Sequence, residues 1–532
     1  MEYLIVTAAM LLSFAAAYGK LYLLSGAILI LAGVVLYAVF FRRSGMLSDP
    51  AALFSISWIG GMGISALKLS FLQTDWEPMT WLCLYGSFLL FLLGLRWTRG
   101  DLREDRRKGK RKKQGLKRGK TENREAFAEG NRLQGSKAGI SPGTDGEKEE
   151  QEKNRFIFLS QRLLSVMGAL TLLSVLAFCF EAWKLKYIPL FTVDTPHAYS
   201  YFHVSGVHYF TVACVLVPAL FILYLDLTGK HCLSLYEAGG KSLKRLLSLG
   251  YGKRLFFAAV CVLLSLFIPL LCVSRFQLIF AAALAVLTKL ALLGRKKPGK
   301  PFFVSFLLLF FCLLLLYVLL TVARAHSVGY LNGIFEMKDP GIPIFITQPY
   351  IYIANNFDNL NVLIRELPGD AHTLGLRMLF PLWALTGLKF LAPGLVSFPL
   401  YVTKAELTTV TLIYDAYYDL GLLGVLAFSL LLGAVCGLFW KRLYQTGAGA
   451  GQNQKGSGSH RRTMAQTQPE GGRPYGEGAE ESRNPALYLF YAQLSFYLMF
   501  SFFTTWFSNP ATWFYFALTS LIGLYLRGGK KA

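Results

Sequence analysis

Two aspartates stand four residues apart in TTVTLIYDAYYDLGLLG (408–424), a stretch whose carboxylates could take part in acid–base chemistry. Residues at this spacing share one face of a helix, so Asp415 and Asp419 are expected to act on the same surface. The apolar run that follows is about long enough to cross a membrane, which places both carboxylates near its outer end. Acidic residues near a helix N-terminus also favour the helix dipole, and this simpler interpretation stays open.

Arginines form a second candidate group. Arg275 lies inside FIPLLCVSRFQLIFAAALAVL (267–287), between two apolar runs that are each long enough to span a membrane. It is therefore expected at the tip of a hairpin, where a guanidinium can bind a diphosphate through its planar fork of donors. Contact with ordinary lipid phosphate is the alternative. Arg324, Arg365 and Arg377 are expected on the same side of the membrane.

Histidines and amides complete the set of candidate residues. His326 and His372 lie close to arginines in the sequence and are candidates for proton transfer. Tyr352, Asn355 and Asn356 belong to a polar and aromatic cluster of the kind that binds sugar hydroxyls while a ring stacks on the pyranose. The same composition is typical of loop turns, and that interpretation is equally weighted.

The elements that position these residues are expected to be membrane-spanning helices. The chain of 532 residues is 54% apolar, has a mean hydropathy of +0.44 and contains many apolar runs of about twenty residues. This composition excludes a soluble domain and predicts an all-α polytopic membrane protein with about twelve transmembrane helices. The predicted spans are 3–18, 21–41, 51–70, 79–96, 156–181, 206–228, 254–273, 276–293, 302–321, 410–440, 486–506 and 510–527.

The distribution of charge predicts the orientation of the chain. The formal net charge is +23, and nearly all Lys and Arg clusters fall in alternate loops between the predicted spans. Basic loops stay in the cytoplasm, so both termini are expected there. Orientation therefore explains the basic excess, and a nucleic-acid partner is not expected.

The predicted spans divide the chain into seven parts. A long loop on the outer side is expected to carry function, because long connections in compact proteins are uncommon. Within it, 371–394 is predicted as a helix in the membrane interface, with a re-entrant hairpin as the alternative. The parts are a four-helix region (1–96), a charged linker expected to be disordered (97–155), spans five to nine (156–321), the outer loop (322–409), span ten (410–440), a flexible loop (441–485), and the last two spans with a basic tail (486–532).

The sequence predicts no metal site and no cofactor. The eight cysteines include no CxxC pair, and the histidine spacings match no zinc motif. Asp75 and Glu77 form a DxE pair, which some metal-dependent membrane glycosyltransferases use, but one such pair is a weak signal.

Four segments together resemble the oligosaccharide repeat unit polymerases, the Wzy-like O-antigen polymerase family of bacterial envelope glycan synthesis. The resemblance covers about residues 156–527. Its segments are YIPLF (187–191), VSR (273–275), YIYIANNFDNL (350–360), and YYDLGLLG followed by LLLGAVCG (417–437).

The resemblance implies a helical glycosyltransferase of GT-C-like architecture in the cytoplasmic (inner) membrane. It would act without a metal and join oligosaccharide repeat units, linked to undecaprenyl diphosphate, into a surface polysaccharide on the outer face. The expected partners are this lipid-linked oligosaccharide and membrane lipids, with a chain-length regulator and a flippase as further candidates. The expected catalytic residues are Arg275, Arg324, Asp419 and His326, and the expected substrate-binding residues are Arg365, Arg377, His372, Asp415, Tyr352, Asn355 and Asn356.

Two other functions stay open at this point. A ligase moves finished glycan to a different acceptor and needs the same leaving-group site. A lipid-glycan flippase or other transporter should carry its charges on spans that line a cavity, whereas the charged residues here lie near the ends of the predicted spans.

Overall fold

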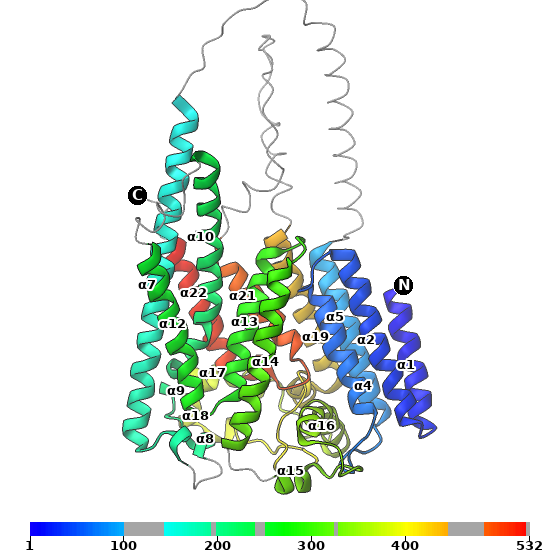
Figure 1. The fold of residues 1–532 in the computed structure, drawn as a ribbon. Coiled ribbons are helices and arrows are strands. Elements are labelled where there is room, and N and C mark those ends of the chain that lie inside the picture. Colours follow the sequence, from blue (N-terminus) through cyan, green and yellow to red (C-terminus); the bar gives the residue numbers. More distant parts are fainter. Residues whose placement is uncertain (101–142, 193–197, 240–250, 324–327, 445–483, 528–532) are drawn as a thin grey trace, which may run out of the picture.

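The computed structural model describes residues 1–100, 143–192, 198–239, 251–323, 328–444 and 484–527. These residues form helices and connecting segments, and the described part contains no β-strand beyond an isolated bridge between Ser70 and Met337. Most helices run side by side as a bundle (Figure 1). In lipid, a helix satisfies its backbone hydrogen bonds within the segment, which explains why the apolar runs are helical.

The bundle contains the following elements in chain order: α1 (Glu2–Tyr18), α2 (Tyr22–Ser44), α3 (Pro50–Phe54), the π-helical η1 (Ser55–Ile59), α4 (Gly60–Ala66), α5 (Pro78–Arg99), α7 (Gly143–Leu185), α9 (Val207–Thr211), η3 (Val212–Leu216), α10 (Val217–Gly239), α12 (Tyr251–Leu271), α13 (Arg275–Leu293), α14 (Lys300–Ala323), α19 (Tyr414–Tyr444), α21 (Ala486–Met499) and α22 (Pro510–Arg527). Within the described residues, eight helical segments are long and apolar enough to cross a membrane. They lie in α2, α5, α7, the α9–α10 segment, α12, α13, α14 and α19. The chain is therefore a polytopic helical membrane protein.

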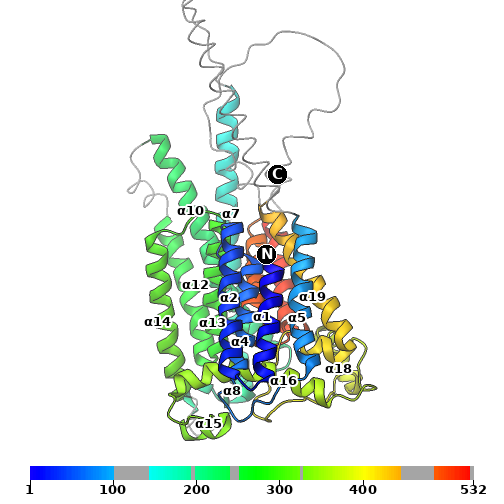
Figure 2. The same cartoon turned by 90° about the vertical axis from the view of Figure 1, so that its right-hand side faces the viewer.

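Several short helices and one long one lie at a single end of the bundle. They are η2 (Pro189–Phe191), α8 (Ala198–Tyr201), α15 (Val328–Phe335), α16 (Ile344–Glu366), α17 (Phe380–Leu385), α18 (Leu388–Leu391), η4 (Pro393–Leu395) and η5 (Trp506–Ser508). Figure 1 views α16 nearly along its axis while the bundle helices run vertically, and Figure 2 shows it crossing the lower end of the bundle. We call this end the α16 end.

The opposite end of the bundle carries basic residues in the last turns of several helices, and we call it the basic end. Arg43 at the end of α2 pairs with Glu2 at the start of α1, with 2.6 Å between Nη2 and Oε2. Arg99 at the end of α5 lies 3.7 Å from the ring of Trp440 near the end of α19. The first residues of α1 and the last residues of α2, α5 and α19 therefore meet at one end. The same end holds Arg96, Lys441, Arg442 and Arg527.

The outer loop differs from its prediction. Its longest element is α16, a helix that the sequence did not predict, whereas the segment 371–394 forms only the short helices α17, α18 and η4. Gly387 separates α17 from α18. Its φ of 79° lies in the left-handed region, which interrupts the helix. The interfacial helix predicted over 371–394 is therefore broken into pieces.

Helices α5 and α19 pack against each other through glycines. A Cβ at Gly433 of α19 would lie 2.0 Å from the carbonyl oxygen of Phe91, and one at Gly94 of α5 would lie 2.0 Å from that of Leu430. Such distances are possible only for glycine, which lets two helix backbones approach closely. Gly424 of α19 does not take part in this contact, because a Cβ there would meet Ala416 and Leu420 of its own helix.

Substitution of Gly433 by alanine is therefore expected to destabilise the protein. The added methyl group would meet backbone atoms, which cannot rotate away, so α5 and α19 must separate. We expect a loss of about 1–3 kcal/mol, seen as a lower midpoint of thermal unfolding for the protein purified in detergent. Gly229→Ala in α10 is the matched control, since its Cβ would meet nothing within 4 Å. Equal midpoints for the two variants would contradict this account of the packing.

Candidate functional site

Arg377 is held at the entrance of α19 by charge and by aromatic rings. Its Nε donates to Oδ1 of Asp415 at 2.7 Å, and the side chains are only 15% and 7% exposed. The guanidinium carbon lies 4.4 Å from the ring centroid of Tyr418, with Tyr414 and Phe398 at 5.7 and 5.8 Å. Cation–π contacts and a buried carboxylate fix the position of the guanidinium without using all five of its donors.

Asp419 anchors the loop that carries Arg377. It is almost completely buried, and its carboxylate accepts from the backbone N–H groups of Arg377 at 3.1 Å and Met378 at 2.8 Å, and from the hydroxyl of Thr373. Both oxygens are therefore engaged by protein donors. The sequence predicted Asp419 for positioning or base work, and in this structure its carboxylate holds the loop of Arg377.

A break in α19 creates further acceptors for the same loop. Leu420 and Gly421 leave the helical conformation, and Gly421 adopts φ 57° and ψ −144°, which is open to glycine but strained for other residues. The carbonyl oxygen of Asp419 accepts from the N–H of Leu374 at 3.1 Å. The predicted straight span over 410–440 thus begins at Tyr414 and bends within its second turn.

His372 uses the same break. Its Nδ1 lies 3.0 Å from the carbonyl oxygen of Tyr418, which can only accept, so Nδ1 carries the proton in this contact. The neutral ring then has its acceptor at Nε2. His372 is half-buried beside Tyr417, with 6.2 Å between ring centroids, and could take a proton from a bound molecule.

Arg275 begins α13 at the same end of the bundle. Its side chain is largely buried, and the guanidinium carbon lies 4.9 Å from the ring centroid of Tyr317, whose hydroxyl donates to Gln348 of α16. The next residue, Phe276, stacks on Phe503 with ring centroids 5.2 Å apart. The hairpin tip predicted from the sequence is thus largely buried and is linked to α16 through Tyr317.

A single turn, residues 500–508 between α21 and α22, contacts the residues that follow both arginines, Phe276 and Met378. Its Phe503 meets the residue after Arg275, and its Ser508 donates to the sulfur of Met378 at 3.3 Å, next to Arg377. The residue-275 hairpin and the loop of Arg377 therefore each contact this turn, the first through Phe276 and the second through Met378. The predicted catalytic residues Arg324 and His326 lie outside the described residues.

The amides of α16 hold the outer loop in place. Asn356 donates to the carbonyl oxygen of Phe502 at 2.8 Å and accepts from Thr409 at 2.6 Å, and Asn355 accepts from Thr403 at 2.7 Å. Both asparagines are almost fully buried. In this structure both asparagines anchor the segment 403–409, and their role in binding sugar hydroxyls stays a prediction.

Two further predicted residues lie at different places on α16. Tyr352 is half-buried, with its ring centroid 6.2 Å from that of Phe503, and so faces the 500–508 turn. Arg365 lies near the other end of the helix and pairs with the adjacent Glu366 at 2.9 Å, both well exposed. It is separated from Gln348 by about 25 Å of helix. Arg365 therefore does not join the group around Arg275.

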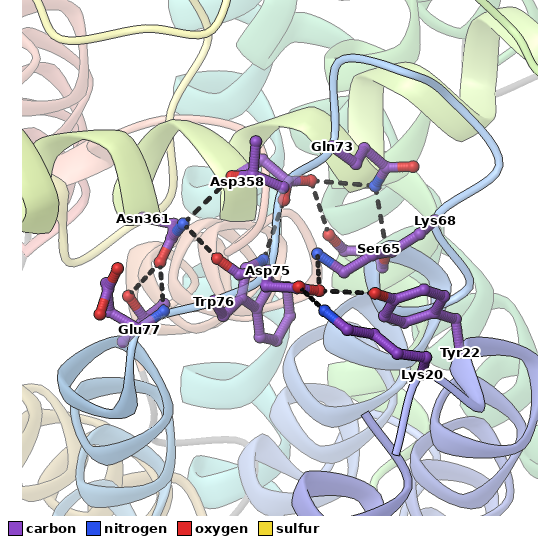
Figure 3. A network of polar contacts seen from close by, with 12 residues as sticks. Lys20, Tyr22, Ser65, Lys68, Gln73, Asp75, Trp76, Glu77, Asp358 and Asn361 are labelled. Atoms are coloured by element: carbon purple, nitrogen blue, oxygen red, sulfur yellow. Dashed lines mark hydrogen bonds and ion pairs between the residues drawn. The ribbon is translucent and has the colours of Figure 1, made fainter. Parts of the chain in front are cut away.

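Asp358, another member of the polar cluster that the sequence singled out, is a buried carboxylate on α16. Asp358 accepts from Ser65 at 3.1 Å and from Gln73 and Trp76 at 2.9 Å each, and it is completely buried (Figure 3). Burial raises the pKa of Asp358, although Lys68 and the three donors favour its charged form. This network ties α16 to α4 and to the segment before α5. No periodic signal marks it, since its members come from distant parts of the chain.

The described residues contain no group of three His, Cys, Asp or Glu side chains that could hold a metal ion. The two residues of the DxE pair make separate contacts. Asp75 binds Lys20 and accepts from the hydroxyl of Tyr22, whereas the backbone N–H of Glu77 donates to Asn361 at 2.8 Å.

Comparison with known proteins gives no relative: no family model, no curated protein and no solved structure matches this chain.

Proposed function

We propose that this protein is a membrane glycosyltransferase that joins undecaprenyl-diphosphate-linked oligosaccharide repeat units into a surface polysaccharide. In this proposal the chain crosses the cytoplasmic membrane twelve times in a GT-C-like arrangement, and the α16 end faces outward. The Arg and Lys residues at the opposite end support this orientation, since such residues stay on the cytoplasmic side.

The observation that carries the proposal is the fixed guanidinium of Arg377 at the entrance of α19. Asp415 and three aromatic rings hold it in place, and the 500–508 turn separates it from a second buried arginine, Arg275. Prepositioned cations of this kind stabilise negative charge that develops on a diphosphate leaving group. Rings beside them suit the apolar face of a sugar.

The proposed reaction is a transfer at the anomeric carbon of the growing chain. The bond between this carbon and the diphosphate oxygen breaks, and its electron pair stays on the diphosphate, where Arg377 and Arg275 stabilise it. A hydroxyl oxygen of the acceptor unit forms the new bond to the carbon, and its proton passes to Nε2 of His372. Asp415 and Asp419 hold Arg377 and its loop in position.

The direct test is an assay with the purified protein and lipid-linked repeat units in lipid nanodiscs. Products that lengthen by whole repeat units would support the proposal. Transport of the units across the membrane without lengthening would replace it with a flippase. In cells that lack the protein, single repeat units should accumulate, whereas accumulation of long unattached polymer would indicate a ligase.

Replacing His372 by asparagine should lower the rate of lengthening by about a hundredfold. The asparagine amide can still donate toward the carbonyl oxygen of Tyr418, so the loop contact is kept while the proton acceptor is lost. The measurement is single-turnover lengthening with a saturating acceptor. His203→Asn is the control, because His203 is exposed and lies in the segment before α9, outside the loop that carries Arg377. A rate for His372→Asn equal to that of the control would remove His372 from the mechanism.

A further inference from the structure

Two lysines and a tyrosine contact the carboxylate of Asp75 at the α16 end, and a third lysine, Lys338, lies over the ring of the same tyrosine. Lys20 lies in the turn between α1 and α2, Tyr22 begins α2, and Lys68 follows α4 (Figure 3). The Nζ atoms of Lys68 and Lys338 lie 5.7 and 5.9 Å from the ring centroid of Tyr22. Asp75 lies among them, and we call this group the lysine niche.

Backbone pairing holds two of these lysines together. The N–H of Lys338 donates to the carbonyl oxygen of Leu69, and the N–H of Phe71 donates to that of Glu336, both at 2.9 Å. These bonds flank the bridge between Ser70 and Met337. Like charges are thus kept close by the main chain, which indicates that the cluster is more than a chance meeting of surface side chains.

Lys68 is the unusual member of the niche. Its side chain is only 6% exposed, and within the described residues its Nζ has no hydrogen-bond partner. The closest carboxylate oxygen, Oδ1 of Asp75, is 3.9 Å away, and the ring of Trp76 lies 5.9 Å away. Burying an ammonium group without hydrogen bonds is unfavourable, so Nζ lacks an acceptor that a bound anion would supply.

Asp75 occupies the position such an anion would take. The carboxylate is half-exposed, binds Lys20 and accepts from the hydroxyl of Tyr22 at 2.8 Å. Burial alone would raise its pKa, but the hydrogen bonds from Lys20 and Tyr22 and the charge of Lys68 outweigh burial and lower it.

The other carboxylates nearby are already engaged. Asp358 accepts from Ser65, Gln73 and Trp76, and Glu336 pairs with Lys404 at 2.7 Å. Asp75 is the carboxylate that pairs with both Lys20 and Lys68, while the charge of Asp358 also acts on Lys68 without a hydrogen bond to it.

We propose that the lysine niche binds a phosphate-type oxyanion and that Asp75 is an internal occupant which this ligand displaces. A phosphate group offers more negative charge and more acceptor oxygens than a carboxylate, so it can satisfy Lys68 together with Lys20 and Lys338. The ligand is a phosphate-bearing molecule, either free or as a lipid headgroup. This proposal does not depend on the glycosyltransferase function.

The test is calorimetric titration of the purified full-length protein in detergent with inorganic diphosphate. Asp75→Asn keeps the shape and the hydrogen bond from Tyr22 but removes the competing charge, so it should bind diphosphate about tenfold more tightly than the natural protein. Lys68→Met should bind it about tenfold more weakly. Lys389→Met in α18 is the control lysine outside the niche and should change nothing. Failure of Asp75→Asn to bind more tightly than the natural protein would overturn the proposal.

Thermal unfolding separates this site from a purely structural ion pair. Methionine fills the space of Lys68 and removes the buried charge that has no hydrogen bond. Lys68→Met should therefore unfold at the same temperature or higher, while diphosphate binding weakens. A lower unfolding temperature would identify Lys68 as a structural partner of Asp75 and count against a binding site.

Nanodiscs distinguish the two sources of the ligand. If the site takes a lipid headgroup, nanodiscs of phosphatidylglycerol should weaken diphosphate binding relative to nanodiscs of phosphatidylcholine. Equal binding in both supports a free phosphate compound. Absence of diphosphate binding in detergent and in both kinds of nanodisc would show that the niche binds no phosphate.

Discussion

Replacing Arg377 by alanine is expected to lower the rate of glycan lengthening by about two to three orders of magnitude. The guanidinium would no longer stabilise charge on the leaving diphosphate, and Asp415 would lose its partner at 2.7 Å. The measurement is single-turnover lengthening of lipid-linked repeat units, together with the thermal unfolding midpoint, because a buried carboxylate left alone also destabilises the fold.

Two further variants separate chemistry from folding at this position. Arg377→Lys keeps the positive charge but not the planar fork, so it should recover part of the stability and little of the activity. Arg365→Ala is the matched control, since Arg365 is exposed and pairs only with its neighbour Glu366 in the contacts described above. Full-length polymer made at the normal rate by Arg377→Ala would remove the central residue of the proposed function.

The apolar runs predicted the bundle because a membrane leaves few alternatives. Where about twenty apolar residues follow one another, the backbone must satisfy its own hydrogen bonds, and a helix is the local way to do so. The predictions near Arg275 and Leu293 matched α13 to within a residue. The prediction over 486–506 did not, because α21 ends at Met499 and the chain then turns back through residues 500–508.

Helix α16 escaped prediction because it buries polar residues together with apolar ones, which removes the contrast between two faces. Five polar residues between 355 and 361 are almost completely buried, and groups from distant loops satisfy them. Hydrophobic periodicity detects a helix only when its apolar side faces the core. Here the bonding partners come from segments such as 403–409, and their positions depend on the whole fold.

The candidate site shows the same division between local and distant information. The four-residue spacing indicated that Asp415 and Asp419 work together, and both do hold the loop around Arg377. The spacing carried no information on their partner, which lies 38 residues away from Asp415 in the chain. The break at Gly421 was also unexpected, because a glycine in an apolar run is equally consistent with close helix packing.

Removing the carboxylate of Asp358 is expected to have the largest effect on stability, at about 3–5 kcal/mol. Asp358→Ala would leave the N–H groups of Gln73 and Trp76 buried without their acceptor, and it would separate α16 from α4. Because α16 also anchors the loop before α19, the outer loop should lose its order along with it. We expect a much lower thermal unfolding midpoint in detergent and rapid protease cleavage within 367–413.

Asp358→Asn and Trp76→Phe provide the sharper test of this network. The asparagine has one acceptor oxygen in place of two, so at least one buried donor loses its partner, at a cost of about 1–3 kcal/mol. Phenylalanine at position 76 removes the indole N–H that donates at 2.9 Å, so the double variant should be less destabilised than the sum of the single ones. Asp370→Ala, in the exposed segment after α16, is the control. If the losses of the two single variants add up in the double variant, the carboxylate and the indole act independently. If Asp358→Ala unfolds at the same midpoint as the control, α16 is held by its apolar contacts alone.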